Sequence, residues 1–185
     1  MIELLIWFQS NYPELKKALM ESHHNFDDRD VNPYHIEGDC WSHTMLVCKI
    51  AELNNYDKVV QVSALLHDIG KPQSRKVNPK NNHVQFFGHE EISANMAKPL
   101  LDDLIEKAML SREEADEVVE LIRLHGFLYK EKNPDVIYKK FKGKSRLFKH
   151  LLDLRKCDNL GRFTNKVGTF ELDIESLIER IDFYI

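Results

Sequence analysis

The sequence lacks a long apolar run, and it has few cysteines. A helix that crosses a bilayer needs about 18 consecutive apolar residues, and no stretch of this chain approaches that length. The apolar segment Leu4–Phe8 is short and follows Glu3 instead of a basic region, so we do not expect a signal peptide. The three cysteines are odd in number and irregularly spaced, which argues against a disulfide framework and favours a reducing compartment. We therefore expect a cytoplasmic protein that does not engage a membrane.

Internal repeats, low-complexity tracts and linkers are also absent from the 185 residues. A chain of this length can bury a substantial core in one unit. Its composition, with 43% hydrophobic and 30% charged residues, is ordinary for a globular protein. Cys48 and Cys157 fall on apolar helical patterns, and we expect both as packed core thiols. The prediction is a single domain over residues 1–185.

Helix start and stop signals mark most of the chain. They are capping Asp and Ser residues, a capping box at Ser111 and Glu114, and Gly or Pro after helix ends. The signals predict helices from Pro13 through Met20, over about 41–53, from Asp57 to Asp68, from Gly88 toward Leu104 with an interruption or kink at Pro99, from Ser111 to Leu124, from Asn133, from Ser145 to Leu160, and over about 170–183. A strand pattern occurs only around residues 74–87, where 75–77 and 84–87 can form a short hairpin. The predicted fold class is all-α, a helical bundle with one short β-hairpin.

The dipeptide His67-Asp68 lies on the last turn of a predicted apolar helix, where a core position is ordinarily aliphatic. Such a dipeptide is expected by chance in a chain with this many His and Asp residues, so its position matters more than its presence. Burying an ionised carboxylate there costs several kcal/mol unless it is paired or bound to a metal. The pair therefore indicates a metal site at the end of this helix.

Four other ligand-type residues occupy comparable positions. His43 and His89 lie near predicted helix starts, His125 lies at a helix end, and Asp158 interrupts the apolar pattern of the helix over 145–160. Each His alone is more often structural, but converging helix ends can gather the whole set around one point. Imidazole and carboxylate ligands suit Fe, Mn, Ni, Co or Zn, with Mg as a further option, although all-oxygen sites suit Mg better.

These residues also carry a resemblance to a known family. The chain resembles the HD-domain phosphohydrolases, whose pattern is one His, then His-Asp, then a distant Asp, with two intervening His in the two-metal members. Within that superfamily it is most similar to the HD domain of bacterial tRNA nucleotidyltransferases, the CCA-adding enzymes. The matching stretches occur in the same order over about residues 33–162, and they are His35–Thr44, Leu65–Pro72, Phe87–Ala94, Ile122–His125 and Leu154–Arg162.

The resemblance implies a ligand set and a chemistry. It implies that one metal is held by His43, His67, Asp68 and Asp158. Asp68 would bridge to a second metal held by His89 and His125, although in one-metal variants these two His contact the phosphate or the leaving group instead. Two cations about 3.5–4 Å apart can activate a shared hydroxide for attack on phosphorus.

The resemblance also implies that Lys71 faces the substrate phosphate, and Arg75 could do the same across the loop. An alternative for Lys71 is an interaction with the negative end of the preceding helix dipole. Two departures from the family pattern stand out. Cys157 replaces the usual small residue before the final Asp, which we interpret as a packing variation. About forty residues precede His43, so we expect no nucleotidyltransferase domain and no CCA-adding activity.

The formal net charge of −4 hides a basic segment. Residues 130–149 contain eight bases and two acids, a net charge of +6, and the bases are Lys130, Lys132, Lys139, Lys140, Lys142, Lys144, Arg146 and Lys149. We call these residues the basic strip. The strip joins the helix of His125 to the helix of Asp158, so we expect its ends near the metal site, with Lys140, Lys142 and Lys144 binding substrate. The alternative is a solvated helix face.

The sequence thus predicts a metal-dependent phosphohydrolase for a nucleotide or RNA-end phosphoester, either a phosphomonoesterase or a 2′,3′-cyclic phosphodiesterase. One alternative is a deoxynucleotide phosphohydrolase for dNMP or dNTP, with a closed pocket and no role for the basic strip. A non-catalytic nucleotide-sensing or RNA-binding module is the alternative of another class. The complete ligand set argues against it, because a decayed domain would be expected to lose ligands first.

Overall fold

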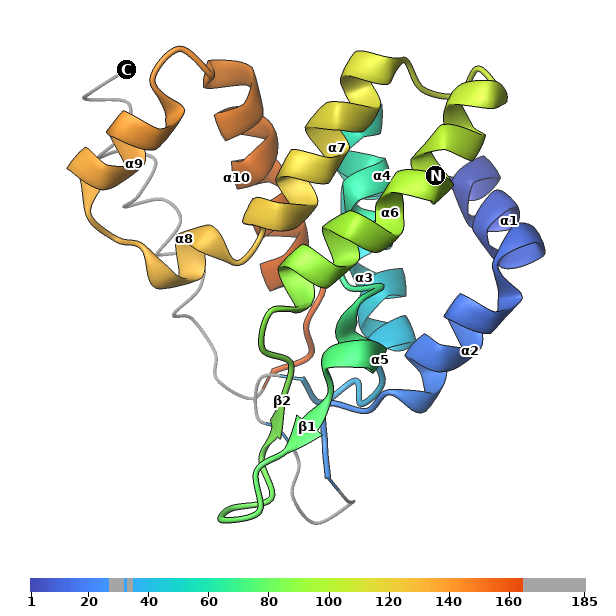
Figure 1. Ribbon diagram of the computed structural model, residues 1–185, viewed down its shortest axis with the longest axis vertical. Helices are drawn as coiled ribbons and strands as arrows, with labels where there is room; N and C mark the ends of the chain where they lie inside the picture. The colour runs from blue at the N-terminus through green and yellow to red at the C-terminus, as the bar shows by residue number, and fades with distance from the viewer. Residues whose placement is uncertain (27–31, 33–34, 165–185) are drawn as a thin grey trace.

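The computed structural model describes residues 1–26, 32 and 35–164 (Figure 1). This part of the chain is a bundle of α-helices with one small antiparallel sheet, which confirms the all-α prediction. The elements are α1 (Ile2–Asn11), α2 (Pro13–Glu21), α3 (Cys40–Leu53), α4 (Lys58–Leu66), α5 (Lys71–Ser74), β1 (Lys76–Val77), β2 (Val84–Gln85), α6 (His89–Glu106), α7 (Arg112–Leu124), α8 (Phe127–Lys130), α9 (Pro134–Phe141) and α10 (Ser145–Leu160). The helix expected over about 170–183 lies outside the described residues. Among the described helices, none has the length and apolar character needed to cross a bilayer.

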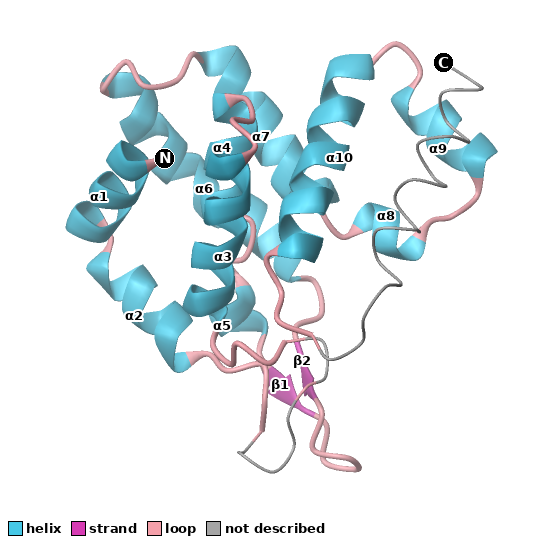
Figure 2. Ribbon diagram, turned by 180° about the vertical axis from the view of Figure 1, so that it is seen from behind, coloured by secondary structure: helices cyan, strands magenta, loops and turns pink. Residues whose placement is uncertain are grey.

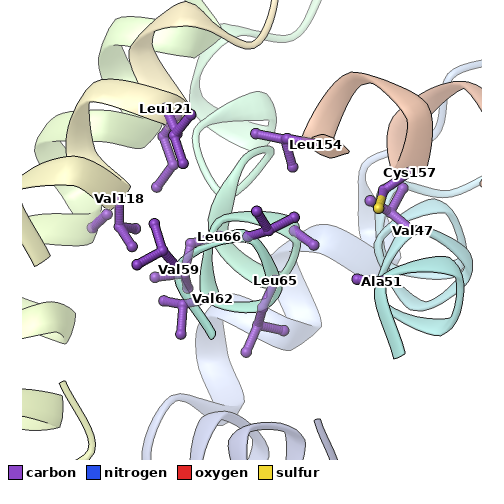
Figure 3. Packing of buried hydrophobic residues seen from close by; sticks show 14 of the residues in the cluster. Val47, Ala51, Val59, Val62, Leu65, Leu66, Val118, Leu121, Leu154 and Cys157 are labelled. Atoms are coloured by element: carbon purple, nitrogen blue, oxygen red, sulfur yellow. The ribbon is translucent and has the colours of Figure 1, made fainter. Parts of the chain in front are cut away.

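Helix α4 forms the centre of the core. Seven of its nine residues are buried, and it packs against α3, α7 and α10. Figure 3 shows its aliphatic side chains beside Val118 and Leu121 of α7 and Leu154 of α10. Each fully buried aliphatic side chain contributes roughly 1.5–3 kcal/mol to stability. The core therefore fixes the end of α4, from which His67 and Asp68 follow. The thiols of Cys48 and Cys157 are buried and free, as expected.

Side-chain caps fix where the helices around the site begin. Asp39 Oδ1 accepts a hydrogen bond from the Ser42 N–H at 2.8 Å, and Asp57 caps α4 in the same way. Ser111 and Glu114 form the predicted capping box at the start of α7. Each cap satisfies N–H groups that have no partner within the helix. As a result, the first turn of α3 carries His43.

Three details differ from the sequence-based expectations. Helix α6 runs without interruption through Pro99. Pro99 is exposed, while the buried neighbours Ala97, Leu100 and Leu101 hold the helix against the core. We expected Pro72 only to end the helix before it. It also lies in the first turn of the short helix α5, where the missing N–H of proline leaves no helix hydrogen bond unmade. Helix α1 was not predicted, and it buries Leu4, Trp7 and Phe8.

The predicted hairpin is present at one end of the bundle (Figure 2). Lys76 pairs with Gln85 and Val77 pairs with Val84. Gly88 then turns the chain into α6 with a φ of +73°, a conformation that glycine adopts without the strain of a side chain. This turn places His89 at the first position of α6, next to the hairpin.

Candidate metal centre

Ligand-type side chains from five helices meet at the hairpin end of the bundle. His43 comes from the first turn of α3, His67 and Asp68 follow α4, and His89 starts α6. His125 caps the end of α7, and Asp158 lies in the last turn of α10. The structure therefore brings together all six side chains that the sequence singled out.

Asp68 lies at the centre of this cluster, and its two oxygens face different partners. Its Oδ2 atom is 3.1 Å from His67 Nε2 and 3.8 Å from His43 Nε2. Its Oδ1 atom is 3.3 Å from His89 Nε2 and 3.8 Å from His125 Nε2. Two groups of possible metal ligands thus share one carboxylate. Asp158 extends the first group, because its Oδ1 atom is 3.0 Å from His43 Nε2.

Backbone contacts fix the tautomers of three of the histidines. The Nδ1 atoms of His67, His89 and His125 lie 2.9, 2.7 and 2.6 Å from the backbone carbonyl oxygens of Ala64, Phe86 and Ile122. A carbonyl oxygen only accepts, so each Nδ1 must carry the proton and donate it. Each Nε2 atom then presents a lone pair to the centre of the cluster. Ligand histidines in metal sites are commonly held in this way.

Glu37 contacts the fourth histidine, and sequence reasoning did not single it out. Its Oε1 atom lies 3.1 Å from His43 Nδ1 and 2.8 Å from His35 Nδ1. Burial on its own raises the pKa of Glu37, but hydrogen bonds with His35 and His43 hold that pKa below the ordinary value. Glu37 is therefore a carboxylate that can orient the His43 ring. The signal that could have found it was its place in the family-like stretch around His43.

The donor set fits a transition-metal cation. Among the described residues, His67 Nε2 and Asp68 Oδ1 are fully buried and have no hydrogen-bond partner. These atoms are acceptors that face further acceptors, an arrangement that is costly unless a cation or proton lies between them. Imidazole nitrogens with carboxylate oxygens suit Fe, Mn, Ni, Co or Zn. The two groups around Asp68 could therefore each hold a divalent ion.

The electrostatics keep the carboxylates charged and His125 neutral. Burial on its own raises the pKa of Asp68, but the neighbouring His67 and the ammonium of Lys71 hold it well below the usual value. Burial on its own also raises the pKa of Asp158, but the charge of Arg162 and the neighbouring His43 hold it well below the usual value. Burial, more than any neighbouring group, lowers the pKa of His125 to about 4. At neutral pH these groups are in the forms that bind metal.

Lys71 lies at the edge of the cluster. Its Nζ atom is 2.6 Å from Asp68 Oδ2 and 3.1 Å from His24 Nε2, and the residue is 7% exposed. Burial lowers the pKa of Lys71, but the charge of Asp68 more than offsets this, so the pKa is raised. Lys71 is thus an ammonium group directed at the carboxylate of Asp68. Its predicted contact with a substrate phosphate stays a prediction.

The structure does not bring Arg75 to the cluster. Its guanidinium donates to the backbone carbonyl of His23 at 3.0 Å and to that of Asn25 at 3.2 Å. These bonds tie the segment before α3 to the end of α5. The contacts of Arg75 are therefore structural, because two of its donors are used on the backbone. Its expected approach to a substrate phosphate finds no support in this geometry.

The basic strip begins beside the cluster, as expected, but its middle lies away from it. Lys130 is close, since it lines the same hollow as Asp68 and pairs with Glu90 at 2.8 Å. Lys144 lies at the start of α10, the opposite end of that helix from Asp158, and Lys142 follows α9 (Figure 1). Lys140, in the last turn of α9, has its Nζ atom 5.1 Å from the ring centre of Phe127. At 1.5 Å per residue, α10 separates its first residue from Asp158 by about 20 Å. The reason is that α10 runs toward the site, so its start is far away.

Two further side chains surround Asp158. Tyr129 Oη lies 2.5 Å from Asp158 Oδ2, and Arg162 Nη2 lies 2.6 Å from the same oxygen. Arg162 also contacts the Tyr129 hydroxyl. Arg162 belongs to the family-like stretch at the end of α10, so the sequence offered a signal for it. Tyr129 had none, because its role depends on how the short helix α8 packs against α10.

Two joined hollows open beside the cluster. The smaller has a volume of about 240 Å³, and its lining includes Asp68, Asp158, Tyr129 and Arg162. The larger has a volume of about 500 Å³ and lies over the hairpin. Their linings share His35, Lys71, His89, Glu90 and Lys130. A ligand could therefore contact the cluster and the hairpin at the same time.

Comparison with known proteins places this site in a family. The chain is 32% identical over 140 residues to the Multifunctional CCA protein of Paraburkholderia phymatum, covering 76% of this chain and 30% of that protein. It is 34% identical over 65 residues to the CC-adding tRNA nucleotidyltransferase of Thermus thermophilus, covering 35% of this chain and 14% of that protein. The chain thus spans less than a third of the length of either relative. The HD domain family matches residues 40–162, a range that includes all six clustered side chains, and this match shows that the chain belongs to the HD domain family.

Proposed function

We propose that this protein is a metal-dependent phosphohydrolase that acts on a nucleotide or RNA-end phosphoester, as a phosphomonoesterase or a 2′,3′-cyclic phosphodiesterase. The observation that carries the proposal is the sharing of Asp68 between two groups of ligand-type side chains. Pairs of metal ions bridged in this way are typical of enzymes that hydrolyse phosphoesters. Membership of the HD domain family supports the same class of chemistry.

In this proposal, His43, His67, Asp68 and Asp158 hold one ion, while Asp68, His89 and His125 hold the other. Divalent cations supply Lewis acidity to a phosphoester and lower the pKa of a water molecule toward neutrality. The protein contributes the orientation of the ligands. Glu37 contacts the Nδ1 atom of His43. Backbone carbonyl oxygens accept from the Nδ1 atoms of His67, His89 and His125.

The charged side chains around the smaller hollow would bind the phosphate. Lys71 and Arg162 both line it and both remain cationic, because burial is offset by the charges of Asp68 and Asp158. Phosphoryl transfer requires mainly positioning and neutralisation of charge on the phosphate oxygens. Tyr129 holds Asp158 and Arg162 in register, and burial together with Asp158 raises its pKa well above the usual value, so it stays protonated.

The RNA-end substrate has two supports. One relative is named as a tRNA nucleotidyltransferase, and the basic strip offers charge complementary to a polynucleotide. The position of Lys144 at the far end of α10 from Asp158 favours the deoxynucleotide alternative, because a single nucleotide would not reach it. The length of the preferred substrate therefore distinguishes an RNA-end phosphohydrolase from a deoxynucleotide phosphohydrolase.

The test is hydrolysis of a phosphoester panel by the protein supplied with Mn²⁺, Co²⁺, Ni²⁺, Zn²⁺, Fe²⁺ or Mg²⁺. The panel contains nucleoside 2′,3′-cyclic phosphates, 3′- and 5′-monophosphates, deoxynucleotides and oligonucleotides with phosphorylated ends. We expect Asp68→Ala to abolish hydrolysis and metal retention together. Asp102→Ala is the matched control, because this carboxylate is exposed and pairs only with Arg112. Full activity of the Asp68→Ala protein, or no activity of the wild type on any substrate, would overturn the proposal.

A further inference from the structure

The larger hollow lies between the metal-ligand cluster and the hairpin. Its lining contains four consecutive hairpin residues, Val84 to Phe87, and it shares five residues with the smaller hollow over the cluster. Its volume of about 500 Å³ falls within the range of about 300–1,000 Å³ that is usual for sites of small molecules. A ligand whose phosphate reached the cluster would therefore have room for its remaining atoms over the hairpin.

Two neighbouring phenylalanines form different parts of this hollow. Phe86 is partly buried against the core, with the Lys71 ammonium 5.3 Å from its ring centre and the His24 ring edge-on at 5.4 Å. Phe86 is therefore part of the wall. Phe87 is 75% exposed, the highest value among the exposed large hydrophobic side chains of the described residues. Single exposed phenylalanines are common on protein surfaces, but this one borders a hollow that leads to a cluster of possible metal ligands.

Gln85 adds a polar group to the same hollow. Its side-chain amide makes no hydrogen bond within the described part of the chain, although its backbone pairs with Lys76. A primary amide offers both donors and an acceptor. The edge of a nucleobase offers the complementary mixture, and Gln or Asn amides commonly read it. The hollow thus combines an aromatic face, an amide and cationic groups at the side that joins the cluster.

We propose that this hollow is a nucleobase subsite, in which the base next to the reacting phosphate stacks on Phe87 and bonds through its edge to Gln85. The inference rests on the proposed phosphohydrolase function and specifies the substrate as a phosphoester that carries a base. Lys71 lies where the two hollows join, and its charge suits the sugar-phosphate portion between the two parts of the ligand. Lys130 lies at the same junction, paired with Glu90. Stacking of a base on an aromatic side chain contributes about 1–3 kcal/mol.

The kinetic test compares two substrates that differ only in the base. These are adenosine 2′,3′-cyclic phosphate and the 2′,3′-cyclic phosphate of methyl riboside. For the metal-loaded protein, Phe87→Ala should raise KM for the adenosine substrate about tenfold and leave kcat near the wild-type value, while the base-free ester should be unaffected. Phe87→Trp should restore the low KM. Leu53→Ala is the matched control, since Leu53 is 67% exposed and lies about 15 Å along α3 from His43.

A binding test separates failure of this inference from failure of the proposed function. Isothermal titration of the metal-free wild type with adenosine 3′-monophosphate should show binding that Phe87→Ala weakens about tenfold and that ribose 3-phosphate does not reproduce. This result would support the subsite even if no phosphoester were hydrolysed. Equal effects of Phe87→Ala on substrates with and without a base would overturn the inference. So would unchanged KM and unchanged nucleotide binding in that variant.

Discussion

The Nε2 atoms of His89 and His125 lie 3.1 Å apart, although neither ring nitrogen has a proton to donate to the other. Both rings use their Nδ1 protons on backbone carbonyls three residues earlier. Two lone pairs therefore face each other, with Asp68 Oδ1 at 3.3 Å from one of them. A cation between the three atoms would remove this repulsion, which makes the pair the main structural argument for a second ion.

The first prediction concerns the number of metal ions. His89→Ala and His125→Ala should each lower the metal content from two ions per chain to one, because they remove a ligand from the second group only. Metal analysis by mass spectrometry after dialysis measures this directly. His83→Ala is the control, since His83 is exposed on the hairpin. A wild-type content of one ion, with metal supplied in excess, would contradict the two-ion assignment and favour phosphate contacts for His89 and His125.

The second prediction concerns Glu37. Its carboxylate is 2% exposed and faces the Nδ1 atom of His43. Partners that orient a ligand histidine typically contribute 10- to 100-fold to metal affinity or activity, so Glu37→Gln should weaken metal binding by about that factor. Competition with a chromogenic chelator measures the affinity. Glu52→Gln is the matched control, because Glu52 lies on the same helix as His43 but pairs with Lys49 at the surface.

An unchanged metal affinity in Glu37→Gln would mean that the His43 ring does not need the Glu37 carboxylate for its orientation. Thermal unfolding of the metal-free variants provides a second readout. Glu37 also accepts a hydrogen bond from the Phe163 N–H, so a loss of stability without a loss of affinity would assign Glu37 a purely structural role.

The third prediction concerns the stability of the metal-free protein in acid. Burial lowers the pKa of His35 to about 4, against a weaker opposing effect of its hydrogen bond to Glu37, and burial lowers that of His125 to about 4. An unfolded His titrates near 6.5, so the unfolded chain binds more protons below that pH. The free energy of unfolding should therefore fall as the pH decreases from about 6.5 to about 4, by up to about 3 kcal/mol for each residue.

The lowered carboxyl pKa values of Asp68 and Asp158 act below this range, because an unfolded Asp titrates near 3.9. Urea unfolding between pH 4 and pH 8 measures the dependence. His35→Gln should remove its own part of the slope and leave the remainder. An identical slope in the wild type and in His35→Gln would show that the pKa of His35 is not lowered in the folded protein.

Local signals predicted most of the fold, because they act within a few residues. The caps at Asp39, Asp57 and Ser111 and the glycine before α6 fix helix ends through short-range bonds. The six clustered side chains were predictable for a related reason: each occupies a helix end or interrupts an apolar face, where an ionisable group needs a special partner.

Contacts between segments that are distant in the sequence could not be predicted in the same way. Glu37 and Tyr129 reach the site only because an irregular segment and a short helix pack against its helices. The course of the basic strip is the clearest difference, since covalent connection to two site-bearing helices suggested that all of its bases lie close to the site. The length and direction of α10 determine how far the middle of the strip lies from the site. A charge pattern in the sequence predicts neither.

The last prediction concerns Lys140, Lys142 and Lys144. Lys144, the residue before α10, lies about 20 Å from Asp158 along that helix, a distance that about six stacked nucleotides cover at 3.4 Å each. Lys140 and Lys142 lie at the end of α9, which leads into α10. Replacing all three with Glu should leave the hydrolysis of a mononucleotide unchanged. Oligonucleotides longer than about six residues should lose affinity strongly, because the substitution removes three phosphate contacts and adds three repelling charges.

Salt dependence provides the independent measure. Each phosphate contact with a single strand contributes a slope of about −0.7 in log K against log salt, so the variant should flatten the slope for long substrates by about 2. The control replaces Lys17, Lys49 and Lys98 with Glu, which changes the net charge equally at exposed positions on other helices. Equal loss on mononucleotides and oligonucleotides would assign the three lysines a structural role. No loss on either would make the strip a solvated surface and favour the deoxynucleotide phosphohydrolase, whose substrate ends within the two hollows.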